Sequence, residues 1–442
     1  MKRVSNLYDN MISYRNILFV YNRVRNKCHN KNKVMYFERF KNTYLIDILE
    51  RLKSGSYCFS RYHIFLIHEK KYRVIMSENI FDKIVNQLVS YFILLPSMNC
   101  LIDSNIATRS GKGSRYGYEL FERYIKAIRG DIFVLRIDIS KYFYNIDHGI
   151  LYGMLKKRIN DKKALKILWD IISLTDFDYV NENISYLVNK EINRVNRLNI
   201  SDNEKNKIIS ELRGIPLYKK GKGLSIGCLS NQLMAIFYLN DIDHYIKEVL
   251  ECKYYIRYMD DIYILSNDRV YLGDCFVKIR EELGKIGLSI NRKSGIYRLK
   301  EGVSFLGYTY TKRDRLCIRY DNSTIRKINS RIKYLYVNDF DLCFRSISSY
   351  KGFFIRCNTS LFFDKYKDVC MNSRYDKYLF IKKRYRDYLV FIRYKNRYYT
   401  YNSDLVFVNR YYGSKYRFFK KKEIMVFDRY IVLEDNRIVI NG

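Results

Sequence analysis

Two adjacent aspartates interrupt an apolar segment near the middle of the chain. The segment 254–266 has the sequence YYIRYMDDIYILS, in which two runs rich in β-branched and aromatic residues flank the pair Asp260 and Asp261. Such runs predict two antiparallel strands joined by a tight turn, with the carboxylates at the turn. Buried adjacent carboxylates repel each other unless a cation compensates their charge, and Mg²⁺ prefers oxygen ligands. Asp-Asp turns also occur in solvated hairpins, so the pair alone leaves both interpretations open.

A third acid ends an apolar strand upstream. Residues 133–140, FVLRIDIS, alternate as a strand that finishes at Asp138. A strand ending in Asp, followed by an apolar helix and then the hairpin, would bring Asp138 beside Asp260 and Asp261. Two cations about 3.5–4 Å apart at such a site can activate a hydroxyl nucleophile and neutralise a leaving pyrophosphate.

The charge balance predicts a polyanionic partner. The formal net charge is +35, and 45 tyrosines offer flat faces on which bases can stack. Biased base composition can also produce a Lys-rich surface, and Tyr, Lys, Asn and Ile are all abundant. We favour nucleic acid, which such a surface binds through its phosphates.

Cysteine usage and the absence of apolar segments bear on location. The ten cysteines form no C-x-x-C pair, and the five histidines complete no zinc pattern. The N-terminal residues MKRVSNLYDN lack the apolar core of a signal peptide, and the run Tyr91–Pro96 is too short to span a bilayer. We therefore expect reduced cysteines, no membrane partner and a cytoplasmic location.

Periodicity predicts a chain that mixes helices and strands. Strand signals are expected to give hairpins over 64–76 and 254–265, a strand over 131–139 and another over 303–310. A polar, Asn-rich insertion over 155–213 should be partly helical, and short β runs should dominate after residue 387, at 388–394 and 398–401. The expected helices span 36–53, 80–95, 231–250, 272–286, 325–337 and 341–366.

Seven motifs in order, over roughly residues 35–360, resemble those of reverse transcriptases. The resemblance is to the bacterial group that includes diversity-generating retroelement, group II intron and phage-defence enzymes. Motif B departs from the usual pattern, with Ser225 in place of Pro and Ile236 in place of Asn, and we expect Ser225 to loosen the turn over the incoming base. The motifs are FLIHEKKYRVI (65–75), ATRSGKGS (107–114), Asp138 to His148, GLSIGCLSNQLMAIFYLNDID (223–243), YMDD (258–261), LSINRKS (288–294) and FLG (305–307).

The resemblance implies an α+β right-hand polymerase. Fingers would occupy residues 1–130, the palm 131–310 with motif B at 214–243, the thumb 311–386, and a small basic, Tyr-rich domain 387–442. The implied reaction is RNA-directed addition of dNTPs to a primer 3′-hydroxyl with two Mg²⁺ ions, for which Mn²⁺ can substitute. The partners would be an RNA template, the DNA product and dNTPs.

The resemblance also implies roles for individual residues. The metal ligands would be Asp138, Asp260 and Asp261, with the backbone carbonyl of Ile139. Phe143, five residues after Asp138, would exclude a 2′-hydroxyl by its bulk. The other nucleotide-binding residues would be Lys71, Arg73, Gly227, Gln232 and Lys293, and the template-binding residues Arg109 and Lys112.

Each of these residues also has an ordinary structural interpretation. Phe143 could be a core residue, and Lys71 with Arg73 could belong to a solvated basic hairpin. Gln232 could be a polar residue at a helix N-terminus, and Lys293 a surface lysine. For Asp147 and His148 we favour a role in capping a helix over one in catalysis.

The biological role is predicted only by analogy. Our first choice is a bacterial anti-phage defence enzyme that copies a structured non-coding RNA, and a diversity-generating retroelement enzyme is the alternative. An RNA-binding scaffold with a dormant palm is opposed by the three intact acids, and an RNA-dependent RNA polymerase is opposed by Phe143. The segment 390–404 somewhat resembles the start of a MutS-type mismatch-recognition domain; a basic thumb extension that grips RNA is the other interpretation.

Overall fold

The chain forms a mixed α/β structure with two compact units, residues Met1–Arg298 and Leu299–Gly442. It is known from a computed structural model. The structure describes residues 3–28, 31–69, 71–320, 322–338, 342–343, 346–347, 349–350, 356–357, 374–394, 396–413, 418–434 and 437–441.

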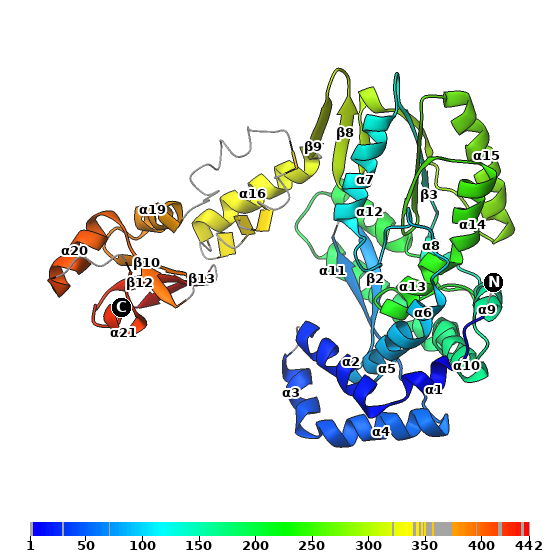
Figure 1. Ribbon diagram of the computed structural model, residues 1–442, viewed down its shortest axis with the longest axis horizontal. Helices are drawn as coiled ribbons and strands as arrows, with labels where there is room; N and C mark the ends of the chain where they lie inside the picture. Colours follow the sequence, from blue (N-terminus) through cyan, green and yellow to red (C-terminus); the bar gives the residue numbers. More distant parts are fainter. Residues whose placement is uncertain are drawn as a thin grey trace. The chain divides into compact units, whose positions relative to one another are not determined.

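A four-stranded antiparallel sheet organises the first unit (Figure 1). Its inner strands bury nearly every apolar side chain, because helix α15 (Arg269–Lys285) packs against three of its strands and α7 (Ser114–Ala127) packs against the fourth. The predicted strand, hairpin and helix of this region are confirmed. In spatial order the strands are β4 (Tyr254–Tyr258), β5 (Asp261–Ser266), β3 (Phe133–Asp138) and β6 (Gly295–Arg298).

Of the two long apolar helices that the periodicity predicts, one is continuous and the other is broken. The expected helix over 80–95 is confirmed as α5 (Ile80–Val89), capped by the Asn79 side chain, and continues through η1 (Ser90–Leu94) and α6 (Leu95–Ser97). The expected helix over 231–250 is broken at Leu239, where the backbone leaves the helical region. Its parts are α13 (Leu229–Tyr238), α14 (Asn240–His244) and η3 (Tyr245–Val249).

Four N-terminal helices precede the first hairpin. They are α1 (Leu7–Met11), α2 (Tyr14–Lys27), α3 (Lys31–Arg39) and α4 (Lys41–Ser54). The helix expected over 36–53 is therefore two helices that meet at Phe40, whose backbone is not helical. The side chains that α2 and α4 bury join the core formed with α5.

The first hairpin and the polar insertion pack together. Strands β1 (His63–His68) and β2 (Tyr72–Ser77) pair antiparallel, which confirms the predicted hairpin, and α11 (Asp178–Asn196) contacts β1. The insertion is almost wholly helical, more than its composition predicted. Its other helices are α9 (His148–Arg158), α10 (Lys162–Ile172), η2 (Ser173–Asp176) and α12 (Asp202–Arg213), with the short α8 (Tyr142–Asn145) just before them.

The second unit begins, after η4 (Leu299–Glu301), with a three-stranded antiparallel sheet. The single strand predicted over 303–310 is wrong: β7 (Val303–Phe305) turns back into β8 (Tyr308–Lys312), because Leu306 and Gly307 take φ angles of +46° and +90°. β9 (Leu316–Tyr320) follows, and α16 (Asn322–Asn338) confirms the helix expected over 325–337. Most of the helix expected over 341–366 lies outside the described residues.

The last part of the chain builds a separate mixed sheet. β10 (Leu389–Tyr394) pairs antiparallel with β11 (Arg397–Tyr399) and parallel with β12 (Tyr430–Glu434), and β13 (Arg437–Asn441) completes it. The predicted β runs are confirmed, but the sequence did not predict α20 (Asn402–Tyr412) between β11 and β12. The other helices here are α19 (Arg374–Arg384) and α21 (Lys421–Ile424). In the described part of the chain, no helix is both long and apolar enough to cross a membrane.

Candidate active site

Pairing of β3 with β5 brings the three acids to one end of the first sheet. Asp138 is the Cα partner of Asp261, and Asp260 lies in the two-residue turn between β4 and β5. Burial, with the negative charges of Asp261 and Asp138, raises the pKa of Asp260 to about 6. Burial also raises the pKa of Asp261, and Asp138 adds to that rise. The three carboxylates therefore interact, and their negative charge is only partly compensated.

This arrangement suits divalent cations. Carboxylates that raise one another's pKa values are stabilised by positive charge, and carboxylate oxygens are the ligands Mg²⁺ prefers. Among the described residues, no three His, Cys, Asp or Glu side chains already converge as a metal cluster. The carboxylate oxygens and their uncompensated charge fit divalent cations. The side chains would have to turn toward the ions to bind them.

Arg136 lies beside this site and was missed by the sequence analysis. It stands two residues before Asp138 on β3, and its Nη2 lies 3.4 Å from Asp261 Oδ1. The guanidinium opposes the rise in the pKa of Asp261 and also sits over the Tyr263 ring at 5.8 Å. The sequence did offer a signal for Arg136, because a charged residue inside an otherwise apolar strand indicates a specific partner.

The loop after α15 anchors the end of β3. The Asp138 backbone N–H donates to Ser294 Oγ at 2.9 Å, and the Asn291 backbone N–H donates to the Asp138 carbonyl at 2.7 Å. An isolated bridge joins Ile139 to Ile290. Lys293 is exposed on this loop, so the loop that carries it is attached directly to the strand that carries Asp138.

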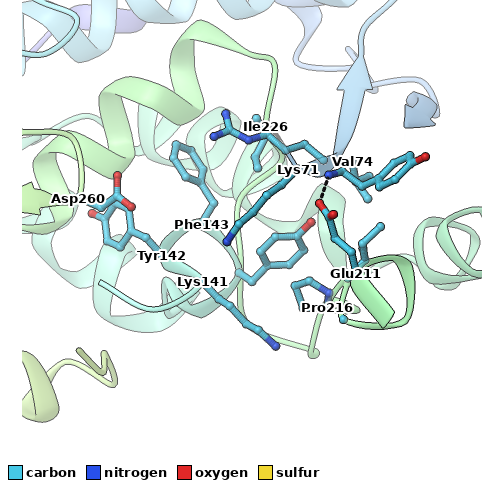
Figure 2. Close-up of a pocket in the computed structure, with 14 residues that line it drawn as sticks. Lys71, Val74, Lys141, Tyr142, Phe143, Glu211, Pro216, Ile226 and Asp260 are labelled. Atoms are coloured by element: carbon cyan, nitrogen blue, oxygen red, sulfur yellow. Dashed lines mark hydrogen bonds between the residues drawn. The ribbon is translucent and has the colours of Figure 1, made fainter. Parts of the chain in front are cut away.

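A cavity of about 470 Å³ opens beside Asp260. Its lining includes Lys71, Arg73 and Phe143, so three of the predicted nucleotide-binding residues share one space with one of the predicted metal ligands. Figure 2 shows the Phe143 ring and the Lys71 side chain between Asp260 on one side and Glu211 on the other. The cavity thus combines carboxylates, cations and an aromatic wall.

The turn at the start of motif B docks on strand β2. The Met76 backbone N–H donates to the Ile226 carbonyl at 3.0 Å. Gly227 has a φ of +137°, and a Cβ there would lie 2.6 Å from the Met76 carbonyl oxygen, so only glycine fits. Gln232 follows in the first turn of α13 and is partly exposed.

Hydrogen bonds hold this turn at Ser225. Its side chain is fully buried, lies 3.1 Å from the Tyr62 hydroxyl, and accepts from Asn231 Nδ2 at 2.7 Å. The looser turn that we expected from Ser in place of Pro is therefore compensated by these contacts. Ile236 is buried in the core, as an apolar helix residue would be.

Comparison with known proteins decides the family. The reverse transcriptase (RNA-dependent DNA polymerase) family matches residues 67–310, more than half of the chain. The chain belongs to this family. It is also 30% identical over 210 residues to a COX1/OXI3 intron 2 protein of Saccharomyces cerevisiae, an alignment that covers 39% of this chain and 23% of that protein. The chain thus matches only about a quarter of the length of this relative.

Two residues predicted to bind template in this reverse transcriptase have internal partners. Arg109 Nη1 donates to the carbonyls of Ile102 at 2.6 Å and Asn105 at 3.1 Å. Lys112 Nζ lies 3.4 Å from Asp103 Oδ1 and 4.0 Å from the centre of the Tyr116 ring. Both side chains hold the loop that precedes α7, and binding of template by either remains a prediction.

The helix cap predicted after motif A is confirmed for Asp147, whereas His148 is the first residue of the helix and does not cap it. The Asp147 side chain accepts from the Ile150 backbone N–H at 3.1 Å and caps α9. His148 is buried, with Nε2 2.7 Å from the Gly223 carbonyl oxygen. The pair connects motif A of this reverse transcriptase to the segment that leads into motif B.

Proposed function

We propose that this protein extends a primer 3′-hydroxyl with dNTPs on an RNA template. The observation that carries the proposal is the cavity in which Asp260 faces Lys71, Arg73 and Phe143, beside the paired Asp138 and Asp261. Carboxylates that attract metal ions lie there beside Lys71 and Arg73, whose charges attract phosphates. Phosphoryl transfer that relies on charge and positioning requires both. Membership of the reverse transcriptase family supports the same reaction.

Asp138, Asp260 and Asp261, with the Ile139 carbonyl, would hold two Mg²⁺ ions, and Mn²⁺ could replace them. Bound there, the metals supply activation of the hydroxyl and neutralisation of charge on the phosphates. Arg73 can fork onto triphosphate oxygens, and Lys71 supplies a point charge. Lys293, Gly227 and Gln232 would border the nucleotide, and Arg109 and Lys112 the template.

Phe143 would select the sugar. Its ring lines the same cavity as Asp260, so it can stand beside the C2′ position of a nucleotide whose phosphates lie near the acids. A ring at that place leaves no room for a 2′-hydroxyl. This is the reason to propose dNTPs as substrates over NTPs, and it opposes an RNA-dependent RNA polymerase.

The domain assignment follows the same proposal. Residues 1–130 would form the fingers, 131–310 the palm, 311–386 the thumb, and 387–442 a basic extension that binds RNA. The last sheet supports the assignment of a separate C-terminal domain. Strands β10 to β13 form their own sheet, and it packs with two separate apolar clusters.

For the biological role, we propose a bacterial anti-phage defence enzyme with a structured non-coding RNA as its template. Within motif B, the segment 226–232, IGCLSNQ, resembles the Gln-ending form found in some defence enzymes and in diversity-generating enzymes, which supports this choice. The same resemblance keeps a diversity-generating retroelement enzyme as the alternative. Sequencing the RNA that co-purifies with the protein, and the DNA made from it, separates the two.

Primer extension tests the proposed reaction. The purified protein is given a primed RNA template with dNTPs or NTPs, and with Mg²⁺, Mn²⁺ or EDTA. We expect DNA synthesis with dNTPs and either metal, and none with EDTA. RNA binding without any incorporation would favour a scaffold with a dormant palm, and preferential use of NTPs would favour an RNA polymerase.

A further inference from the structure

A fully buried ion pair lies directly behind the turn that carries Asp260. Arg257 on β4 and Asp243 on α14 are both 0% exposed. Arg257 Nη2 lies 2.5 Å from Asp243 Oδ2, and Nε donates to Asp243 Oδ1 at 2.6 Å. This is a two-point contact between a guanidinium and a carboxylate, the geometry that fixes both side chains most firmly.

The remaining donors of Arg257 reach two backbone carbonyls. Nη2 donates to Ile236 at 2.9 Å, in the last turn of α13, where helix carbonyls lack partners and a cation is favoured. Nη1 donates to the Met259 carbonyl at 2.8 Å. The ion pair is thereby tied to the peptide that joins Met259 to Asp260.

The turn needs such support. Met259 has a φ of +55°, a left-handed conformation that is unfavourable for a residue with a Cβ. Two-residue hairpin turns favour Gly, Asn or Asp at such positions, and methionine has no local hydrogen bond to offer. The contact from Arg257 to the Met259 carbonyl compensates for this conformation from within the core.

Arg257 is itself held on all sides. Its backbone N–H donates to the Ser104 carbonyl, and its carbonyl accepts from the Ile106 N–H, both at 3.0 Å. Asp243 also accepts a hydrogen bond from the Tyr255 hydroxyl. These contacts hold the guanidinium in place, so its hydrogen bond to the Met259 carbonyl can fix the position of the Met259–Asp261 turn.

Stability alone does not account for this pair. Replacing a buried ion pair with apolar residues of similar size is often neutral or stabilising, because both charges pay a large desolvation cost. We infer that Arg257, oriented by Asp243, is a positioning residue that fixes the backbone of the Met259–Asp261 turn, from which the two carboxylates reach divalent cations. The inference rests on the proposed function, in which Asp260 and Asp261 bind metal.

The test uses the full-length Arg257→Lys variant. Lysine keeps a positive charge beside Asp243 but cannot contact Asp243, Ile236 and Met259 at once. We expect RNA binding and the KM for dNTP to stay near wild type, while kcat falls roughly ten- to hundredfold, as for a displaced catalytic group. Mn²⁺ binding, measured from the free Mn²⁺ signal in electron paramagnetic resonance, should be several-fold weaker. Arg51→Lys, at an exposed pair with Asp47 on α4, is the matched control and should change none of these.

A folded Arg257→Lys protein with wild-type kcat and Mn²⁺ affinity would overturn the inference. If that variant does not fold, the double variant Arg257→Met with Asp243→Leu, which leaves no unpaired charge, is measured and should show the same losses. Failure of both to fold would also overturn it, because the pair would then be a stability element. The Asp260→Asn variant separates the two claims. If Asp260→Asn does not weaken Mn²⁺ binding, the proposed metal site fails. If Asp260→Asn weakens Mn²⁺ binding and Arg257→Lys does not, only the positioning role fails.

Discussion

The acids beside the two four-stranded sheets of this protein are compensated to different degrees. Beside the last sheet, Asp404 in the first turn of α20 is buried, but it accepts from the Val390 backbone N–H at 3.0 Å and pairs with Lys382 at 2.7 Å. In the first sheet, Asp260 and Asp261 lie together, and their pKa values are raised. An acid that serves structure is neutralised by the fold, whereas acids that serve chemistry keep negative charge for a ligand.

The largest expected effect comes from removing that retained charge. Asp260→Asn or Asp138→Asn should lower dNTP incorporation by at least about 100-fold, since charge stabilisation at the reacting phosphates is lost. RNA binding should persist, because the basic surface is unchanged. Primer extension and filter binding measure the two properties. Asp404→Asn, on α20, should retain the rate of polymerisation. Near-wild-type synthesis by both Asp260→Asn and Asp138→Asn would refute the metal site.

The next effect concerns the wall of the cavity. Phe143→Ala should raise the use of NTPs relative to dNTPs by roughly 10- to 100-fold, because a steric block beside the sugar is removed without loss of an acid. The measurement is the ratio of kcat/KM for the two substrates in wild type and variant. An unchanged ratio in an active variant would make Phe143 an ordinary packing residue and reopen the RNA polymerase alternative.

The last sheet should contribute to RNA binding and not to chemistry. Residues 374–442 carry 17 Lys or Arg and 7 Asp or Glu, an excess of 10 positive charges. Removal should start before α19, because Tyr378 and Ile381 pack with β10 in one apolar cluster. A protein ending at residue 373 should bind RNA more weakly and with a shallower dependence on salt, since fewer counterions are released. An unchanged salt dependence would show that this sheet does not contact RNA.

The smallest effect is a pH dependence from Glu78, a half-buried acid. Burial raises the pKa of Glu78 from 4.5 to about 8. Between these values the folded protein binds more protons at Glu78 than the unfolded chain, so stability should fall as pH rises from 4.5 to 8. The contribution is a few kcal/mol at most. Glu78→Gln should flatten this part of the profile of Tm against pH, and an identical profile in the variant would contradict the assignment.

The sequence predicted the parts of the site that lie on regular alternating segments. The strand ending at Asp138 and the hairpin around Asp260 and Asp261 have strong apolar patterns, broken only by one arginine in each, and the structure has both. For these acids local pattern sufficed, because strand register alone places them. Phe143 was predicted from the resemblance to reverse transcriptases, and it lines the cavity with Asp260.

The positioning contacts could not be predicted in this way. The partner of Arg257 is Asp243, 14 residues upstream in a helical segment, and no periodicity connects a strand residue to a helix residue. The turn in 303–310 depends on Leu306 taking a left-handed conformation that leucine seldom adopts, so it was predicted as strand. Arg109 looked free to bind phosphate, and only the fold shows that it donates to two carbonyls of its own loop.

The most direct test of the metal site is crystallographic. Crystals of the full protein soaked in Mn²⁺ are measured at a wavelength where manganese scatters anomalously. The account predicts anomalous peaks beside the carboxylates of Asp138, Asp260 and Asp261, and their loss in crystals of Asp260→Asn. No peak at these residues, from a protein that polymerises DNA in the same Mn²⁺ concentration, would contradict it.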